Sequence, residues 1–444
     1  MSDLLSIGAS GVRANQAALT TVSENIANAG VVGFSRRSIT TSEISAPTAS
    51  GATSGYGVFV TGVSRAADQF KAEAVRSAGA DLARTEAGGV WLDRIDSALT
   101  GSGLGSRLTA FFTAAKGVAA DPTATAPRAA MLEQAATLAA AFRSTGTALA
   151  QATSELDATA DGAVASLNTL SASLAKVNDG LGRAQPNSAA AANLSDQRDA
   201  ILEQMSGLVD VSVSFDAAGR ASVRAGGSGG PALVSGNQVN TVSYARNADG
   251  AVAFAVKIGN DVSTLTPAGG SLGGVVDGAQ RLADARVALN ELATNFVAGV
   301  NDLQANGRTL DGTAGPAMFS VGAAPTDISM TLSDPRGIAA ASASEGTRGN
   351  GNLAALESLR SNASYEDKLT GLVAGNGAAI AARNTVADAQ SAIRDGAITA
   401  RDAISGVDLD TEAVSLLRFQ QAYQASSKVI QVARETLQSI LDIR

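Results

Sequence analysis

Two short segments carry residue types whose spacing could support catalysis or phosphate binding. Ser173 and Lys176 have the Ser-x-x-Lys spacing of serine acyl-transfer enzymes, in which a lysine sits beside the nucleophilic hydroxyl. Gly101, Gly103 and Gly105 give a glycine-rich run like that of a phosphate loop, whose backbone amides hold an anion. Neither segment has the expected context, because no Lys-Thr-Gly accompanies the serine and the glycines follow a helical pattern instead of a strand. We therefore interpret the first segment as a solvated pair on a helix and the second as a helix break.

The composition excludes most other chemistry. The 444 residues include no His and no Cys, which removes catalytic triads, zinc sites, iron–sulfur clusters and disulfides. The net charge is -8 without a basic stripe, which argues against nucleic acid as a partner. No apolar run approaches the roughly 20 residues of a membrane span, and the first residues lack the basic segment of a cleaved secretory signal. We therefore predict no enzymatic activity, no catalytic, cofactor or metal residues, and no binding to nucleic acid or membrane.

Asp196, Arg198 and Asp199 form a compact group of charges. On a helix they could form a local ion-pair cluster or a solvated charged face, and the residues alone leave both interpretations open. Trp91 is the only tryptophan, and we expect it to lie in the core.

Apolar residues recur every seven positions at both ends of the chain. Near the N-terminus the repeat comprises Leu5, Val12, Leu19 and Ile26. Near the C-terminus it comprises Leu409, Leu416, Tyr423, Ile430 and Leu437, with Phe419 at the three-residue offset. A sustained seven-residue repeat gives a helix one apolar stripe and favours coiled-coil packing. Each end therefore predicts a helix that needs a partner.

The flanks of both repeats are Ala, Ser, Gln, Asn and Gly, whereas a solvated coiled coil has many Glu and Lys. Such stripes occur in the core of single chains and at assembly surfaces, and the two terminal helices could serve both purposes. The uncharged flanks favour assembly. Because short helices are marginal in water, we expect both ends to be loosely ordered in a single copy and to become ordered when subunits pack.

Between the ends the hydrophobic pattern changes twice. Residues 63–185 have Ala-rich helical patterns with breaks at 100–103 and 121–122, and a helical pattern continues through 193–206 with Asn193 as its N-cap. Apolar residues alternate at 209–215 and 251–256 and more weakly at 239–244, with turn signals at 216–219, 226–231 and 247–250. Helical patterns return at 275–304 and from about 349 to the end, separated by loops and short strands at 307–335.

The predicted fold class is mainly α with an inserted all-β domain, an α+β multidomain chain. The terminal helices pair as a coiled coil, long helices form the middle domain, and a small antiparallel unit forms the outer domain. The domain boundaries we predict are 1–62 plus 405–444 for the terminal domain, 63–206 plus 275–404 for the helical domain, and 207–274 for the β domain. This nesting places both termini at one end of the molecule.

Several motifs resemble those of bacterial flagellar axial proteins, the rod, hook and hook-associated proteins. The N-terminal likeness runs from Asn15 to Arg37, and the C-terminal one from Val407 to Ala425. Four internal stretches resemble the hook-associated protein 1 family of the hook–filament junction. They are 103–122 with its Phe-Phe pair, 194–199 leading into 209–215, 270–274, and Asp-Pro at 334–335 before 338–342.

Two departures from the family pattern stand out. The family loop usually reads Thr-Pro-Gly-Tyr, whereas this chain has Val31, Val32, Gly33 and Phe34. Val32 lacks the fixed φ of proline, so we expect a less rigid turn. Some relatives carry a further outer domain, for which the short stretch 319–329 leaves no room.

The resemblance implies a structural subunit that forms a layer between hook and filament. Its implied partners are copies of itself, the hook protein, a second junction protein and an export chaperone on the C-terminal segment. It also implies an extracellular place in the flagellum, reached by flagellar type III export without a cleaved signal, and a role for 196–199 at the junction between the helical and β domains. The assembly residues expected beside the two repeats are Asn28, Gly33, Phe34, Arg36 and Arg37, in the loop after the first helix.

Two alternatives remain at this point. A hook or rod subunit shares both terminal motifs, but such subunits have mainly β middle domains, unlike the long helices expected here. A ligand-binding or enzymatic module on the β insertion is more remote, because residues 209–258 offer few acids, one Tyr and no Trp.

Overall fold

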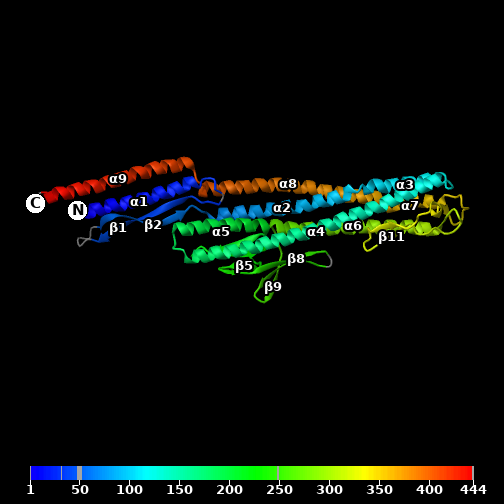
Figure 1. Ribbon diagram of the computed structural model, residues 1–444, viewed down its shortest axis with the longest axis horizontal. Coiled ribbons are helices and arrows are strands. Elements are labelled where there is room, and N and C mark those ends of the chain that lie inside the picture. The colour runs from blue at the N-terminus through cyan, green and yellow to red at the C-terminus, as the bar shows by residue number, and fades with distance from the viewer. Residues whose placement is uncertain (1, 32, 48–52, 248–249, 443–444) are drawn as a thin grey trace.

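The computed structural model describes residues 2–31, 33–47, 53–247 and 250–442. Figure 1 shows an elongated molecule whose long helices run along its length, with both termini at the same end, as the nested order predicts.

The first elements are α1 (Ser2–Ala27), β1 (Arg37–Pro47), β2 (Thr53–Arg65), α2 (Gln69–Gly101), α3 (Leu104–Ala120), α4 (Thr125–Arg183) and α5 (Ala189–Leu208). The strands β3 (Val211–Phe215), β4 (Ala221–Ala225), β5 (Ala232–Ser235), β6 (Gln238–Val239), β7 (Thr241–Arg246), β8 (Val252–Ile258) and β9 (Asp261–Leu265) follow.

The remaining elements complete the body and return to the first end. They are α6 (Gly270–Asn306), β10 (Gly307–Arg308), β11 (Phe319–Val321), β12 (Ile328–Met330), the short 3₁₀ helix η1 (Pro335–Gly337), β13 (Ala341–Ser342), α7 (Gly351–Ala363), α8 (Tyr365–Ser405) and α9 (Leu409–Asp442). The helical patterns predicted at 275–304 and from 349 onward are therefore confirmed, as are the short strands between them.

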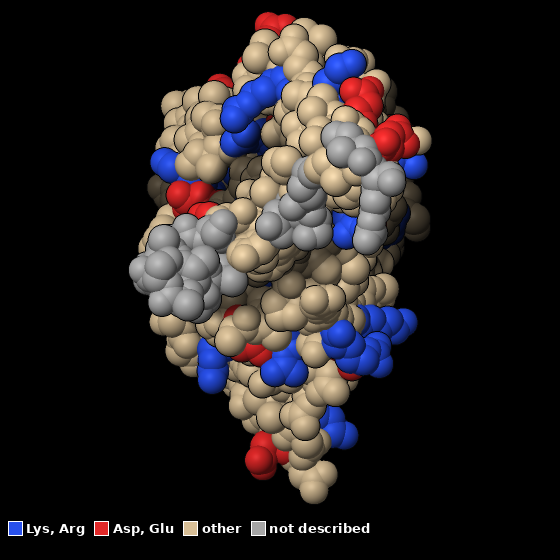
Figure 2. Space-filling model, turned by 90° about the vertical axis from the view of Figure 1, so that its left-hand side faces the viewer, with Lys and Arg blue, Asp and Glu red and all other residues tan. Residues whose placement is uncertain are grey.

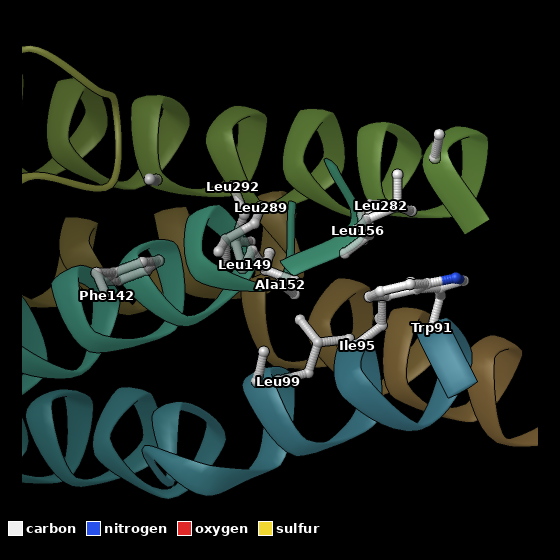
Figure 3. Close-up of a cluster of buried hydrophobic side chains, with 14 of the residues drawn as sticks. Trp91, Ile95, Leu99, Phe142, Leu149, Ala152, Leu156, Leu282, Leu289 and Leu292 are labelled. Carbon is white, nitrogen blue, oxygen red and sulfur yellow. The ribbon is translucent and has the colours of Figure 1, made fainter. Parts of the chain in front are cut away.

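The body is a bundle of long helices around a continuous apolar core. Figure 3 shows Trp91 and Ile95 of α2 beside Leu149 and Leu156 of α4 and Leu289 of α6. The expectation for Trp91 is confirmed, since its side chain is only 4% exposed. Toward the end far from the termini, Phe296 packs among five other aromatic rings with centroids 5.5 to 6.3 Å away: Phe111, Phe112, Phe142, Phe319 and Tyr365.

The inserted β unit contains two antiparallel sheets, with strand orders β3-β4-β5-β6 and β7-β8-β9. The alternating segments predicted as strands correspond to β3, β7 and β8. Amide side chains of α4 anchor both sheets. Nδ2 of Asn178 donates to the carbonyl of Ala221 at 2.8 Å, and Nδ2 of Asn168 donates to that of Val242 at 2.9 Å. The sheets are therefore fixed along one side of the helical body.

One substantial element was not predicted. Strands β1 and β2 form a long antiparallel hairpin after the loop that follows α1, within the range 1–62 that we assigned to the terminal coiled-coil domain. Its pairing runs from Arg37 opposite Arg65 to Pro47 opposite Thr53, with two register shifts. The correction has a clear origin in the sequence, because β-branched residues are dense in both strands and favour extended structure.

Two helix boundaries also need correction. Helix α2 begins at Gln69, after β2, whereas the pattern predicted helix from 63. Helix α5 begins at Ala189, and its N-cap is Ser188, whose Oγ accepts from the amide of Ala191 at 3.1 Å. Asn193 is therefore inside the helix.

The two predicted helix breaks are confirmed, since α2 ends at Gly101 and α3 ends at Ala120. The turn signal at 247–250 includes two residues outside the described ones, and Val32 of the substituted loop is also outside them.

Candidate assembly surface

The terminal helices α1 and α9 lie side by side and run antiparallel (Figure 1). A Cβ added to Gly8 of α1 would lie 2.8 Å from Cγ1 of Ile430 in α9, so the glycine permits close approach. Farther along, Nδ2 of Asn15 donates to Oγ of Ser426 at 3.3 Å. At the other end of the pair, Nδ2 of Asn25 donates to Oε2 of Glu412 at 3.1 Å. A regular coiled coil between these helices stays a prediction.

Helix α1 is covered on two sides. The hairpin packs against it opposite α9, and the amide of Val58 in β2 donates to Oγ of Ser10 at 3.1 Å. The most buried apolar residues of α1 are Ala14, Ala18 and Val22, spaced four apart. The seven-residue repeat did not identify them, because two of the three are alanines and because a helix buried on two sides has no single stripe.

The predicted seam residues fall into two groups. The half-buried ones are Val12, Leu19, Ile26, Leu416, Phe419, Tyr423 and Ile430. The exposed ones are Leu5, Leu409 and Leu437, with exposed fractions of 40%, 55% and 43%. Most of the seam is therefore partly covered within the single chain, and its ends are open to solvent.

Helix α9 leaves most of its surface uncovered. Only Glu412 and Ala433 are buried among its 34 residues. Its exposed large apolar residues are Leu409, Val414, Leu417, Val429, Val432, Leu437, Ile440 and Leu441. Figure 2 looks onto this end of the molecule, where uncharged residues dominate and the charged ones lie in separate small groups. Large exposed apolar patches are typical of interaction sites, so α9 is a candidate assembly surface.

The loop after α1 connects the terminal helices to the body. The amide of Arg36 donates to the carbonyl of Ser405 at 2.8 Å, and its carbonyl accepts from the amide of Ala66 at 2.8 Å. Gly33 has a φ of 84°, a left-handed conformation that suits glycine, and Phe34 lies under the guanidinium of Arg37, 4.8 Å from its ring centroid. Asn28 closes the end of α1, since its Nδ2 donates to the carbonyl of Glu24 at 2.8 Å.

Arg37 is buried in an ion-pair network within the chain. Its Nη2 donates to Oδ2 of Asp196 at 2.7 Å and to Oδ1 of Asn193 at 2.7 Å. Asn25 fixes the adjoining backbone, because its Oδ1 accepts from the amide of Arg37 and its Nδ2 donates to the Arg37 carbonyl. The guanidinium is therefore held inside the molecule, whereas the resemblance implied a place between subunits.

The same network reaches the hairpin and the β unit. Nε of Arg65 donates to Oδ1 of Asp196 at 2.6 Å, and its Nη2 donates to Asp199. Burial alone would lower the pKa of Arg65, but Asp199 and Asp196 raise it above its ordinary value. Arg198 donates to Asp199 and to the carbonyl of Gly219, with burial lowering its pKa. The three charges at 196–199 thus connect the hairpin, α5 and the β unit, which selects the ion-pair interpretation over a solvated face.

The segments examined for catalysis have other roles. Oγ of Ser173 donates to the carbonyl of Thr169 at 3.0 Å along α4, and Gly103 adopts a φ of 64° between two helices. Among the described residues, no group of three or more acidic side chains could hold a metal ion. Within the same ranges no helix is both long and apolar enough to cross a lipid bilayer.

The described structure is thus an elongated helical body that ends in a pair of helices with exposed apolar residues. The sequence pattern of the family described as "Flagellar hook-associated protein FlgK helical domain" matches residues 92–319, just over half of the chain. The chain therefore belongs to the FlgK family of flagellar hook-associated proteins. Residues 401–443 match a second pattern, described as "Flagellar basal body rod FlgEFG protein C-terminal".

Individual relatives agree with this assignment. Flagellar hook-associated protein 1 of Salmonella typhimurium LT2 is 29% identical over 341 residues, which cover 72% of this chain and 60% of that protein. This chain therefore spans about three fifths of the Salmonella relative. The protein of the same name from Escherichia coli K12 is 25% identical over the full length of both chains. A solved structure titled as the flagellar hook junction protein FlgK from Burkholderia pseudomallei matches with a TM-score of 0.51 and 22% identity, covering 56% of this chain and 47% of that one, which shows similarity of fold.

Proposed function

We propose that this chain is a non-enzymatic structural subunit of the bacterial flagellum and forms the junction layer between hook and filament. The single observation that carries this proposal is the uncovered apolar face of α9, which lies within the matched C-terminal pattern. The names of the relatives, hook-associated and hook junction protein, support the location. The proposed location of the subunit is extracellular, and the proposed export route is the flagellar type III system, without a cleaved signal.

The proposed mechanism is geometric. Copies side by side would bury the exposed residues of α9 against neighbouring α1–α9 pairs, which then line the inner wall of a tube. The helical body would form the wall, and the β unit the outer rim. Because only two of 34 residues of α9 are buried in the single chain, packing between copies would supply most of the order of the terminal helices. A heterologous contact repeated around an axis generates such a layer.

The proposed partners follow from this surface. Copies of the chain would contact one another through α1 and α9, the hook protein would lie below the layer, and a second junction protein above it. During export, a chaperone would shield the C-terminal segment, since exposed residues such as Val414 and Leu417, 67% and 56% exposed, would otherwise associate early.

The two alternatives have weaker support. A hook or rod subunit agrees with the C-terminal pattern, but the match to the FlgK helical domain over 92–319 favours the junction protein. For a ligand-binding β module, the concave face of β3–β5 encloses about 240 Å³. Its lining is mostly serine, with Arg224 as its charged residue and no carboxylate. The lining therefore lacks the paired carboxylates that most glycoside hydrolases use.

A deletion strain tests the proposal directly. Electron microscopy should show hooks without filaments, with filament subunits released into the medium, and expression of the chain should restore filaments. Leu417→Asp should fail to restore them, because it places a charge in the proposed contact. Val262→Asp is the matched control, since Val262 is 70% exposed on β9, in the β unit. Filaments of normal length in the deletion strain, or with Leu417→Asp, would contradict the proposal.

A further inference from the structure

A groove of about 750 Å³ lies at the joint between the terminal helices and the body. Its walls include Gly33 and Phe34 from the loop after α1, Ile398 and Ala403 from α8, and Ala72 and Arg76 from the first turns of α2. The space is far larger than one water molecule. Its lining combines apolar side chains, among them Phe34, Ile398 and Ala403, with charged ones such as Arg76 and Asp408.

Phe70 begins α2 beside this groove. Its side chain is 82% exposed, the highest fraction among the large hydrophobic residues of the described chain. The position is well defined, because Oδ1 of Asp68 caps the helix and accepts from the amides of Phe70 at 2.8 Å and Lys71 at 3.2 Å. An aromatic ring held in this way presents apolar surface to solvent at a fixed place.

The geometry of α2 keeps the side chain of Phe70 away from the groove of the same copy. Ala72 and Arg76 are four residues apart and line the groove from one face of α2. Phe70 precedes Ala72 by two residues, a rotation of about 200° around the helix. The ring therefore lies on the opposite side of α2, at the same height along the long axis of the molecule.

We propose that Phe70 of one copy packs into the joint groove of the next copy. This inference rests on the proposed function, in which copies lie side by side in a layer. When two copies lie parallel, Phe70 of one copy and the groove of the next lie at the same height along the molecule. Because the ring and the groove are on opposite sides of α2, the contact joins two different surfaces and is therefore heterologous. Repetition of that contact generates a helical layer and not a closed dimer.

Charge supports a second copy as the occupant. Asp408 lines the groove and hydrogen-bonds the amide of Thr411 at 2.7 Å, with no basic side chain of the described residues within 4.0 Å. Lys71 follows Phe70 directly and likewise forms no ion pair within the described part of the chain. A neighbour that inserts Phe70 would bring Lys71 toward Asp408.

Disulfide trapping tests the contact directly, because the chain contains no cysteine. Phe70→Cys and Ala403→Cys, combined in the full-length chain and oxidised after assembly, should give a ladder of covalent multimers on a denaturing gel. Each single variant should remain monomeric. A double variant that assembles but stays monomeric would overturn the proposal. Dimers from Phe70→Cys alone would also overturn it, since they indicate a two-fold contact.

The energetic test uses a truncation. Phe70→Ala should raise the concentration needed for assembly by roughly tenfold or more, as expected for loss of a buried aromatic side chain. Val90→Ala is the matched control, a 50% exposed residue on the same helix, and should change it less than about twofold. If Leu417→Asp blocks assembly while Phe70→Ala leaves it unchanged, this inference fails and the proposed function stands. If the unmodified chain neither assembles nor docks onto hooks, both fail.

Discussion

Asp196 of α5 accepts a hydrogen bond of 2.6 Å from Nε of Arg65 in β2, across 131 positions of the chain. The same carboxylate also accepts from Arg37 at the start of the hairpin. One acidic side chain of the body therefore holds both strands of the hairpin, and the hairpin in turn covers α1. Through this connection the body determines how the terminal helices are presented to neighbours.

Asp196→Asn should weaken the contact between the hairpin and the body. The change removes the charge that Arg37 and Arg65, with side chains 5% and 14% exposed, share at Asp196, and leaves Arg65 with Asp199 alone. We expect a loss of about 3 kcal/mol in the free energy of unfolding measured with urea. Proteolysis in the hairpin should also become faster.

Asp179→Asn is the control for that variant. Asp179 pairs with Arg183 on the exposed surface of α4, with side chains 46% and 74% exposed. Loss of such a pair should change stability by less than about 1 kcal/mol. If the two variants lose the same free energy of unfolding, the buried network is not the main interaction that holds the hairpin to the body.

Gly8→Ala tests the close packing of α1 against α9. The added Cβ would lie 2.8 Å from Cγ1 of Ile430 and 3.3 Å from its backbone nitrogen. The helices must then separate, and we expect faster hydrogen exchange in both within assembled material, where they are otherwise protected. Gly162→Ala is the matched control within α4, where nothing lies within 4 Å of the new atom, and it should stabilise the chain by about 0.5–1 kcal/mol. Unchanged exchange of the terminal helices in assembled Gly8→Ala would refute the close contact.

The stability of the bundle should depend on pH through Asp277. Oδ1 lies 3.0 Å from Nη2 of Arg84 in α2, and Oδ2 lies 2.9 Å from Nη2 of Arg383 in α8. Burial alone would raise the pKa of Asp277, but the two arginines lower it below its ordinary value of 3.8. A carboxyl with a lower pKa in the folded chain stabilises the fold above its unfolded pKa and loses this contribution on acidification.

The expected result is a decrease in unfolding free energy as the pH falls below about 4. Asp277→Asn should be less stable at neutral pH and should show a smaller decrease in acid. The measurement is urea unfolding of both proteins from pH 3 to pH 7. Parallel curves for the two proteins would rule out this carboxyl as a contributor.

Periodicity predicted the long helices and the alternating strands well, because both patterns repeat over many residues. The hairpin β1–β2 was missed because the prediction for the N-terminal region relied on the seven-residue repeat, which ends at Ile26, and assigned no strand to the residues after the loop. The alternation of Tyr56, Val58 and Val60 could have identified β2. Asn193 was taken for an N-cap because Asn is common there, while its side chain in fact accepts from Arg37.

Sequence pattern could not pair charges that lie far apart in the chain. Asp196 and Arg198 were recognised as a charged cluster, but their partners Arg65 and Gly219 come from separate elements. The groove at the joint is likewise formed by four distant segments. Such sites depend on tertiary packing, which local spacing does not encode.

The central claim is that the terminal helices gain their order from neighbouring copies. Hydrogen–deuterium exchange of the full-length chain, compared between dilute monomer and assembled material, measures this directly over 2–27 and 409–442. We predict exchange close to that of an unfolded peptide in the monomer and strong protection after assembly, with the helical body protected in both. Full protection of both terminal helices in the dilute monomer would contradict the account.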